Sequence, residues 1–198
     1  SHLWVGGYVK GFATLQDPAS VREINDSERQ QIWLNPIRLK LFWQPGSWVS
    51  GELAYELAGR VQRGVAAGAG DLPRPAPFAY RVKDLRTHLY PASGGFGRTF
   101  ALTQNLDRAL ITICLPLVDI YVGRQAIAFG SARVVNPTDV VAPFTYEALD
   151  KEERVGVDAI RLRFPVGMMG ELDVGAISGR NFWLKHGAGF VRSRFYVQ

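Results

Sequence analysis

Residues 33–43, WLNPIRLKLFW, decide the fold class, because apolar and basic side chains alternate strictly over their second half. One face carries Ile and Leu residues together with Trp43, and the opposite face carries Arg38 and Lys40. Successive side chains of a β-strand point to opposite faces, so this alternation predicts a strand with one apolar and one charged face. Pro36 predicts either a bulge or a strand that begins just after it.

The next stretch, residues 48–61 or WVSGELAYELAGRV, alternates in the same way. The link between the two stretches, QPGS, is rich in turn-forming residues, so the pair predicts a β-hairpin. The charged residues on the polar face of this second strand are Glu52, Glu56 and Arg60.

The alternation recurs along the chain and predicts an all-β fold, an antiparallel meander of about eight or nine strands. Helical patterning is weak and is limited to short stretches near residues 20–30 and 138–152. Further strands are predicted at residues 3–15, 105–130 (two strands that turn at Pro116 and Leu117), 157–165, 171–178 and 187–197, with another candidate at 80–90.

Strands with one apolar and one charged face fit two different environments. In a soluble antiparallel sheet, the charged face meets water and the apolar face packs on a core. In a transmembrane barrel, the apolar face meets lipid and the charged face lines the lumen. The first environment would make the chain a soluble β-barrel or β-sandwich that binds a ligand, and it stays open as the alternative.

Three features of the sequence favour the membrane barrel. Several predicted strands reach the roughly 9–11 residues that cross a bilayer at a tilt. Aromatic residues gather at predicted strand ends, where an interfacial girdle would place them. Short turns alternate with long polar connections, as in outer-membrane barrels. We therefore expect residues 1–198 to form a single domain of antiparallel transmembrane β-barrel.

In such a barrel, the charged side chains of the strands would line the lumen and contact the solute. The chain has 23 Lys and Arg residues against 18 Asp and Glu residues, and this excess predicts a mild preference for anions. The residues expected along the solute path are Arg38, Lys40, Glu52, Glu56, Arg60, Arg108, Arg124, Arg161, Arg163, Glu171 and Asp173.

Arg124 is an exception to the alternation, because it shares the parity of the apolar residues Ile120 and Val122. That parity would point a charged side chain at lipid, at a cost of roughly 2–4 kcal/mol in mid-membrane. A bulge at Gly123 would turn Arg124 to the opposite face, and we expect such a bulge.

Other kinds of chemistry find little support in the sequence. The single cysteine, Cys114, excludes an internal disulfide and a thiolate zinc site, and we expect no metal and no cofactor. Acidic pairs such as Glu52 and Glu56 fit lumen ion pairs better than a glycosidase pair, and no nucleophile elbow accompanies His88, so we expect no enzyme. The basic residues are interleaved with acidic ones, which argues against nucleic acid as a partner.

One string of motifs resembles a known family. VGRQAIAFG (residues 122–130), NPTDV (136–140), LDKEERVGVDAIRLRFP (149–165) and GELDVG (170–175) follow one another in the order seen in porin-like outer-membrane proteins of Gram-negative bacteria. These proteins are barrels loosely akin to the alginate-export type. The resemblance covers roughly residues 99–179 and implies a channel in the cell outer membrane for small polar or anionic solutes or a polysaccharide. It implies the lipid bilayer as a partner, and other outer-membrane or periplasmic subunits as further candidates.

The charged faces also predict how much of a barrel this chain forms. An eight-stranded barrel is nearly filled by its own side chains, whereas the inward faces here carry many long charged residues. Barrels of the family also end on an aromatic residue, and this chain ends SRFYVQ. We therefore expect an open arc, the N-terminal part of a larger barrel. Its first strand (near 3–15) should not pair with its last (near 187–197).

Overall fold

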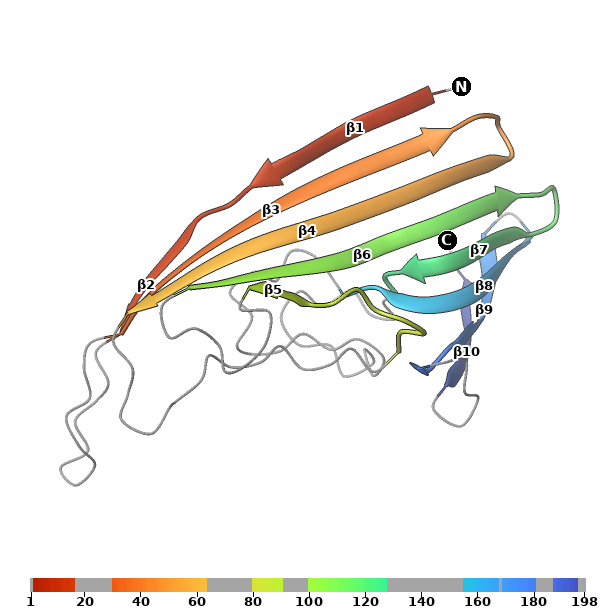
Figure 1. Ribbon diagram of the computed structural model, residues 1–198. Helices are drawn as coiled ribbons and strands as arrows, with labels where there is room; N and C mark the ends of the chain where they lie inside the picture. The colour runs from red at the N-terminus through yellow and green to blue at the C-terminus, as the bar shows by residue number, and fades with distance from the viewer. Residues whose placement is uncertain are drawn as a thin grey trace.

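Ten antiparallel β-strands make up one sheet in the computed structural model of the chain (Figure 1). The structure describes residues 2–16, 30–63, 80–90, 100–127, 155–167, 169–180 and 187–195. The strands are β1 (His2–Val9), β2 (Phe12–Gln16), β3 (Gln30–Gln44), β4 (Val49–Arg63), β5 (His88–Tyr90), β6 (Phe100–Cys114), β7 (Asp119–Gln125), β8 (Val157–Val166), β9 (Gly170–Ile177) and β10 (Ala188–Phe195).

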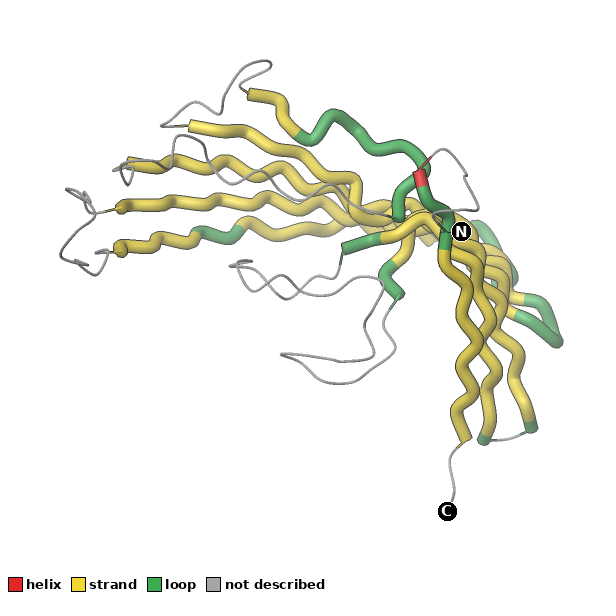
Figure 2. Tube along the Cα trace, turned by 90° about the horizontal axis from the view of Figure 1, so that it is seen from below, coloured by secondary structure: helices red, strands yellow, loops and turns green. Residues whose placement is uncertain are grey.

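The strands follow one another across the sheet in the order β1-β3-β4-β6-β7-β8-β9-β10. β2 pairs with β3 beyond the end of β1, and β5 pairs with β6. β1 and β10 form the two edges and do not pair with each other, so the described sheet is not closed into a barrel, and the expected open arc is confirmed. Strands β8 to β10 run at a steep angle to β1 to β6, and the sheet bends between the two groups (Figures 1 and 2).

Most predicted strands form near their expected bounds. The predicted hairpin is β3 and β4, which pair from Gln31–Arg63 to Trp43–Gly51. The predicted turn at Pro116 joins β6 to β7, and the amide of Leu115 donates to the carbonyl of Val118 at 3.0 Å. The opening stretch splits into β1 and β2, and both pair with β3.

The prediction for Pro36 was wrong, because β3 runs through this residue without a bulge and begins at Gln30. The interruption falls in the neighbouring strand instead. Pro36 lies opposite the break between β1 and β2, where its carbonyl accepts a hydrogen bond from the amide of Lys10 at 3.0 Å. Proline has no N–H to donate to the ladder, so a break in the partner strand leaves no backbone group of Pro36 unpaired.

Two further expectations concern connecting segments. The candidate strand at residues 80–90 forms only over its last three residues, as β5. The helical patterns near residues 20–30 and 138–152 lie outside the described residues, except for Gln30 in β3. Within the described ranges there is no helix with the length and apolar character needed to cross a membrane.

The sheet has two faces of opposite character. The outer face carries exposed apolar side chains such as Leu39, Leu53 and Ile111, which are 57%, 44% and 55% exposed. The inner face carries Arg38 and Asp173, the largest fully buried side chains among the described residues. The alternation predicts that three apolar sets face outward onto lipid, and none of their residues is buried: Leu39, Leu41 and Trp43; Leu53, Tyr55 and Leu57; Leu172 and Val174.

The apolar core is correspondingly small. Ile127, Val157, Ala159 and Ile177 form one buried cluster, with Phe190 packed against it. Ala159 of β8 lies opposite Ile177 of β9, which lies opposite the start of β10. Ile127, just beyond the end of β7, packs at the same end of these strands. The rest of the inner face is therefore held together mainly by charged side chains.

β6 and β7 separate halfway along β6. Their pairing stops at Ala109–Arg124, although β6 extends to Phe100. At the same level, Ala54 of β4 pairs with Arg108 and Tyr55 pairs with Leu106, so Asp107 is an extra residue in β6. An extra residue of this kind bends a strand, and here it leaves both Asp107 and Arg108 buried. We call the gap that opens between β6 and β8 beyond this point the split.

The expected bulge at Gly123 does not form, because the pairing of β7 with β6 and with β8 continues without a register shift through this residue. Arg124 therefore keeps the parity of Val122 and lies opposite Asp158 of β8. It is nevertheless 5% exposed, against 42% for Val122, because its side chain contacts the segment before β5. Gly123 itself has φ of 120°, a conformation that L residues rarely adopt.

Replacing Gly123 tests whether this position of β7 requires glycine. A Cβ at Gly123 would lie 2.1 Å from the carbonyl oxygen of Ala109, so Gly123→Ala adds a backbone clash to an unfavourable φ. We expect a loss of about 3 kcal/mol or more in unfolding free energy, measured by urea titration. Gly167→Ala is the control, because Gly167 also has a positive φ but open space around it, and about 1–2 kcal/mol is expected. Equal losses in the two variants would contradict the proposed role of the contact.

Candidate functional site

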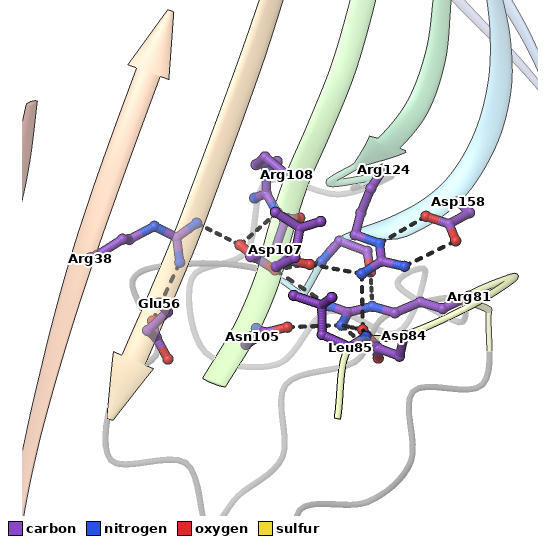
Figure 3. A network of polar contacts seen from close by, with 12 residues as sticks. Arg38, Glu56, Arg81, Asp84, Leu85, Asn105, Asp107, Arg108, Arg124 and Asp158 are labelled. Carbon is purple, nitrogen blue, oxygen red and sulfur yellow. Dashed lines mark hydrogen bonds and ion pairs between the residues drawn. The ribbon is translucent and has the colours of Figure 1, made fainter. Parts of the chain in front are cut away.

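A cluster of eight charged residues surrounds the split, and we call it the central cluster (Figure 3). It draws on β3, β4, β6, β7, β8 and the segment before β5, and it contains four arginines and four carboxylates. Its members are Arg38, Glu56, Arg81, Asp84, Asp107, Arg108, Arg124 and Asp158.

Asp107 lies at the middle of the central cluster and is 2% exposed. Its Oδ2 accepts hydrogen bonds from Nη2 of Arg38 at 2.5 Å and from Nη1 of Arg108 at 2.8 Å. Its Oδ1 accepts the amide of Gly156 at 2.8 Å and lies 3.7 Å from Nη2 of Arg81. The bulge explains why Asp107 is buried here. The extra residue in β6 places a carboxylate at the point where a regular strand would continue its backbone hydrogen bonds.

Arg124 fills the split with its guanidinium group. Nε and Nη2 donate to the two carboxylate oxygens of Asp158 at 2.8 and 3.1 Å. Nη1 donates to Oδ1 of Asp84 at 3.0 Å and to the carbonyl of Leu106 at 2.9 Å, and Nη2 also donates to the carbonyl of Lys83 at 2.9 Å. Arg124 therefore satisfies backbone carbonyls that no neighbouring strand reaches.

Arg81 joins the segment before β5 to β6 and to the start of β8. Its Nε donates to the carbonyl of Gly156 at 2.8 Å, and its Nη1 donates to Asn105 Oδ1 at 2.8 Å and to Asp84. Burial lowers the pKa of the Arg81 guanidinium and the nearby charge of Arg124 lowers it further, whereas Asp84 and Asp107 raise it. Arginine keeps its proton under any ordinary condition, so all these contacts remain charged.

The balance of charge in the central cluster limits what it can do. Its four arginines are matched by four carboxylates, and Arg38, Arg81 and Asp107 are almost completely buried. A passing solute has no access to these side chains. The arrangement holds the strands on either side of the split together, and removing one partner of such a buried pair leaves an uncompensated charge.

A second cluster lies on the inner face of β8, β9 and β10, and we call it the arginine cluster. Arg161 donates to both oxygens of Asp173, and Nη2 of Arg192 lies 3.3 Å from both Asp173 and Glu171. Among the described residues, its four arginines face two carboxylates, which leaves an excess of two positive charges within this set. Its members are Arg161, Arg163, Glu171, Asp173, Arg192 and Arg194.

The arginine cluster is open on one side. The side chains of Arg163 and Arg194 are 32% and 45% exposed, and each lies 3.9 Å from Glu171. The ring of Tyr121 on β7 lies under two of the guanidinium groups, at 5.4 Å from Arg161 and 5.3 Å from Arg163. An aromatic face holds a guanidinium group without neutralising its charge, so this surface keeps its positive field.

The structure brings several of the predicted solute-path residues together and leaves others apart. Arg38 pairs with Glu56 at 3.4 Å, and Arg161 pairs with Asp173. Arg108 and Arg124 belong to the central cluster, and Arg163 and Glu171 to the arginine cluster. The remaining three are half-buried on the inner face outside both clusters: Lys40, Glu52 and Arg60.

Two of these three residues have contacts that sequence reasoning did not predict. The Nζ atom of Lys40 lies 5.7 Å from the centre of the Tyr8 ring. Arg60 donates from Nη2 to Oε1 of Gln62, two residues along β4, at 3.3 Å. The polar inner face of the sheet therefore continues along β4 beyond the central cluster, as far as Arg60 and Gln62.

Several functional residues escaped the sequence reasoning, although signals for some were present. Asp107 and Arg108 are adjacent charges in one strand, and such a pair breaks the alternation as a bulge does. Asp158 and Arg124 both occupy positions where the alternation predicts an apolar side chain. These two residues carry opposite charges and pair with each other. The others that were missed are Arg81, Asp84, Tyr121, Arg192 and Arg194.

Comparisons of the chain with protein-family models, with curated proteins and with solved structures found no match. Among the described residues, no group of three or more His, Cys, Asp or Glu side chains could hold a metal ion. The function is therefore argued from the two faces of the sheet and the two charged clusters.

Removing the Asp107 carboxylate tests the structural role of the central cluster. Asp107→Asn leaves Arg38, Arg81 and Arg108 buried with too little negative charge, and we expect a loss of about 3–5 kcal/mol in unfolding free energy. Glu171→Gln is the control, because Glu171 is partly exposed and its pairs are long, so a change below about 1 kcal/mol is expected. Urea titration of the three proteins under matched conditions measures both. Similar stability of Asp107→Asn and the unchanged chain would show that the cluster does not hold the sheet.

Proposed function

We propose that this chain forms part of the wall of an outer-membrane β-barrel channel that passes small polar or anionic solutes, or a polysaccharide, along a charged lumen. The observation that carries the proposal is the reversed burial of the sheet. Its large apolar side chains are exposed on the outer face, and its largest buried side chains are charged. A sheet in water buries its apolar face, whereas a sheet in lipid exposes it.

The spacing of aromatic residues supports a bilayer on the outer face. Trp33 and Trp43 share the outer face of β3 and are ten residues apart. At about 3.3 Å per residue, this is roughly 33 Å along the strand. A tilt of about 40° reduces it to roughly 25 Å across the membrane, the height of the apolar band in outer-membrane barrels. Phe100 lies in the same row as Trp33, through Val61, and extends this belt across the sheet.

The direction of the strands and the edges of the sheet support a larger barrel. Strands tilted by about 40° on opposite sides of a barrel cross at a steep angle, as β8 to β10 cross β1 to β6 (Figures 1 and 2). Neighbours on the path β1 to β10 alternate in direction, so the two edges run antiparallel to each other. An even number of added antiparallel strands would therefore close the wall, and closure is required because a free edge is not tolerated in lipid.

The backbone at the split also suits an environment without water. In lipid, every backbone polar group needs a partner within the protein. Where β7 leaves β6, Arg124 takes the carbonyls of Leu106 and Lys83, and Asp107 takes the amide of Gly156. Charged side chains thus replace the ladder bonds that a missing strand would have made.

The arginine cluster is the surface that a solute would meet. It carries an excess of positive charge and is partly open, whereas the central cluster is neutral and closed. Rings of basic side chains favour anions in a pore. The preferred solute would therefore be an anion, and Arg163 and Arg194 would contact it.

A charge on the outer face tests the membrane environment. Leu39→Arg places a guanidinium group midway between the two Trp residues of β3, and we expect a loss of about 2–4 kcal/mol in unfolding free energy for the closed barrel folded in lipid vesicles. Trp48→Arg is the control, because Trp48 lies in the short turn between β3 and β4, where a cost of about 0–1 kcal/mol is expected.

The same pair of variants separates the membrane barrel from a soluble sheet. An exposed leucine of a soluble protein can be replaced by arginine with a change within about 0.5 kcal/mol. If the chain stays monodisperse in plain buffer and tolerates Leu39→Arg as well as Trp48→Arg, the soluble ligand-binding alternative is favoured and the barrel proposal fails.

A charge reversal in the arginine cluster tests the solute preference. Arg163→Glu cancels the excess of positive charge, so the preference for anions should disappear. The measurement is the reversal potential of reconstituted channels in a salt gradient. Arg163→Lys keeps the charge and should keep the preference. Cation selectivity in the unchanged channel would contradict the assignment of this surface.

A further inference from the structure

The segment Tyr80–Tyr90 lies in the split, between the edges of β6 and β8. Arg81 reaches Asn105 and Asp107, whose side chains lie on the inner face of β6. At one end of the segment, the carbonyl of Tyr80 accepts the amide of Asp158 at 2.9 Å. At the other end, β5 pairs with β6, so the segment spans the gap between β8 and β6 (Figures 1 and 3).

The segment is attached mainly by side chains. β3 and β4 pair over almost their whole lengths, whereas β5 has three residues and an irregular register with β6. Two hydrogen bonds from Gln104 of β6 reach the carbonyls of Thr87 and Arg86. The middle of the segment, residues 83–86, is exposed. Segments with few ladder bonds open locally at much lower cost than the strands around them.

Arg124 joins this segment to the sheet on both sides. Toward the segment, its guanidinium group donates to the carbonyl of Lys83 and to Asp84. Toward the sheet, it donates to Asp158 and to the carbonyl of Leu106. The carboxylate of Asp158 also accepts the amide of Val82 at 2.8 Å, so one carboxylate holds both the arginine and the segment.

We propose that residues 82–90 are a movable segment, while Arg81 stays on Asp107, and that the contacts of Arg124 with Asp84 and Asp158 are the latch that holds this segment in the split. The movement itself rests on the geometry alone. Its effect on passage rests on the proposed channel: release of the segment opens the split between β6 and β8 in the wall of the lumen.

The latch should respond to salt. The side chains of Asp84 and Asp158 are 28% and 18% exposed, whereas that of Asp107 is 3% exposed. Mobile ions screen partly exposed pairs more strongly than buried ones. Rising ionic strength therefore weakens the latch before it weakens the contacts of Asp107, and the open state becomes more populated.

Hydrogen exchange tests the movement without requiring a channel. Asp158→Asn removes the charge that holds Arg124, and we expect the amides of residues 82–90 to exchange about tenfold faster, with β3 and β4 unchanged. Glu171→Gln is the matched control, because it removes a partly exposed carboxylate from the arginine cluster and should leave residues 82–90 unchanged. Higher salt should accelerate exchange of the same segment in the unchanged chain. Equal exchange in all these samples would overturn the proposal.

A reversible cross-link tests the movement in a protein whose latch is intact. His88 and Thr103 are paired across β5 and β6, so a disulfide between them would fix the segment to the sheet. The variant carries His88→Cys and Thr103→Cys in a Cys114→Ser background, which removes the natural thiol. We expect oxidation to abolish the salt-dependent exchange of residues 82–90 and reduction to restore it. Salt-dependent exchange that persists after oxidation would count against the latch.

Conductance of the same cross-linked protein tests the effect on passage. We expect oxidation to lower the mean single-channel conductance and to abolish the rise in conductance that accompanies release of the segment. Reduction should reverse both effects. Conductance that does not change with the state of the cross-link would overturn the effect on passage. If no conductance is seen although exchange behaves as expected, the proposed channel fails and the movable segment stands.

Discussion

The rest of the structure depends on one interaction: the ion pairs between the carboxylate of Asp107 and guanidinium groups from three parts of the chain. A regular antiparallel sheet would continue β7 along the whole of β6. The extra residue at Asp107 ends that pairing and places a buried negative charge at the point of separation. Arg38 from β3, Arg108 from β6 and Arg81 from the segment before β5 then meet on one group. Without these arginines the bulge would bury an unpaired carboxylate, which costs far more than an ordinary hydrogen bond.

The separation at Asp107 gives the two charged clusters different tasks. Arg124 occupies the space that β7 vacates, and its contacts with Asp158 and Asp84 complete a set of charges that sums to zero. Charges matched and buried in this way hold strands in place and offer nothing to a solute. On the other side of the bend, the arginines of β8 and β10 outnumber the carboxylates of β9. The positive field of the inner face therefore arises where the sheet is regular, away from the split.

The alternation of side chains predicted most strands and both hairpin turns, because a period of two residues follows from strand geometry in any solvent. It failed at the split. Asp107 shifts β6 by one residue, and Arg124 keeps the parity of its apolar neighbours but is buried by the segment before β5. The sequence marks both positions as exceptions to the alternation, but it does not say what resolves them. The partners of Arg124 were unpredictable for another reason: Asp84 and Asp158 are 40 and 34 residues away in the sequence, and only the folded split brings them together.

Pattern alone could not choose between lipid and water, and the reason lies in the chemistry of the inner face. The apolar side chains of the outer face are compatible with lipid, and also with water if a partner covers them. The charged side chains of the inner face are different, because the buried ones need partners of opposite charge and cannot form a hydrophobic core. Arg38 and Asp173 are buried and paired with charges of opposite sign. A second sheet packed on this face would have to desolvate the arginine cluster, in which the described arginines outnumber the described carboxylates. Water or a charged ligand therefore suits the inner face better than an apolar partner does, and the outer face is left as the apolar surface that another medium covers.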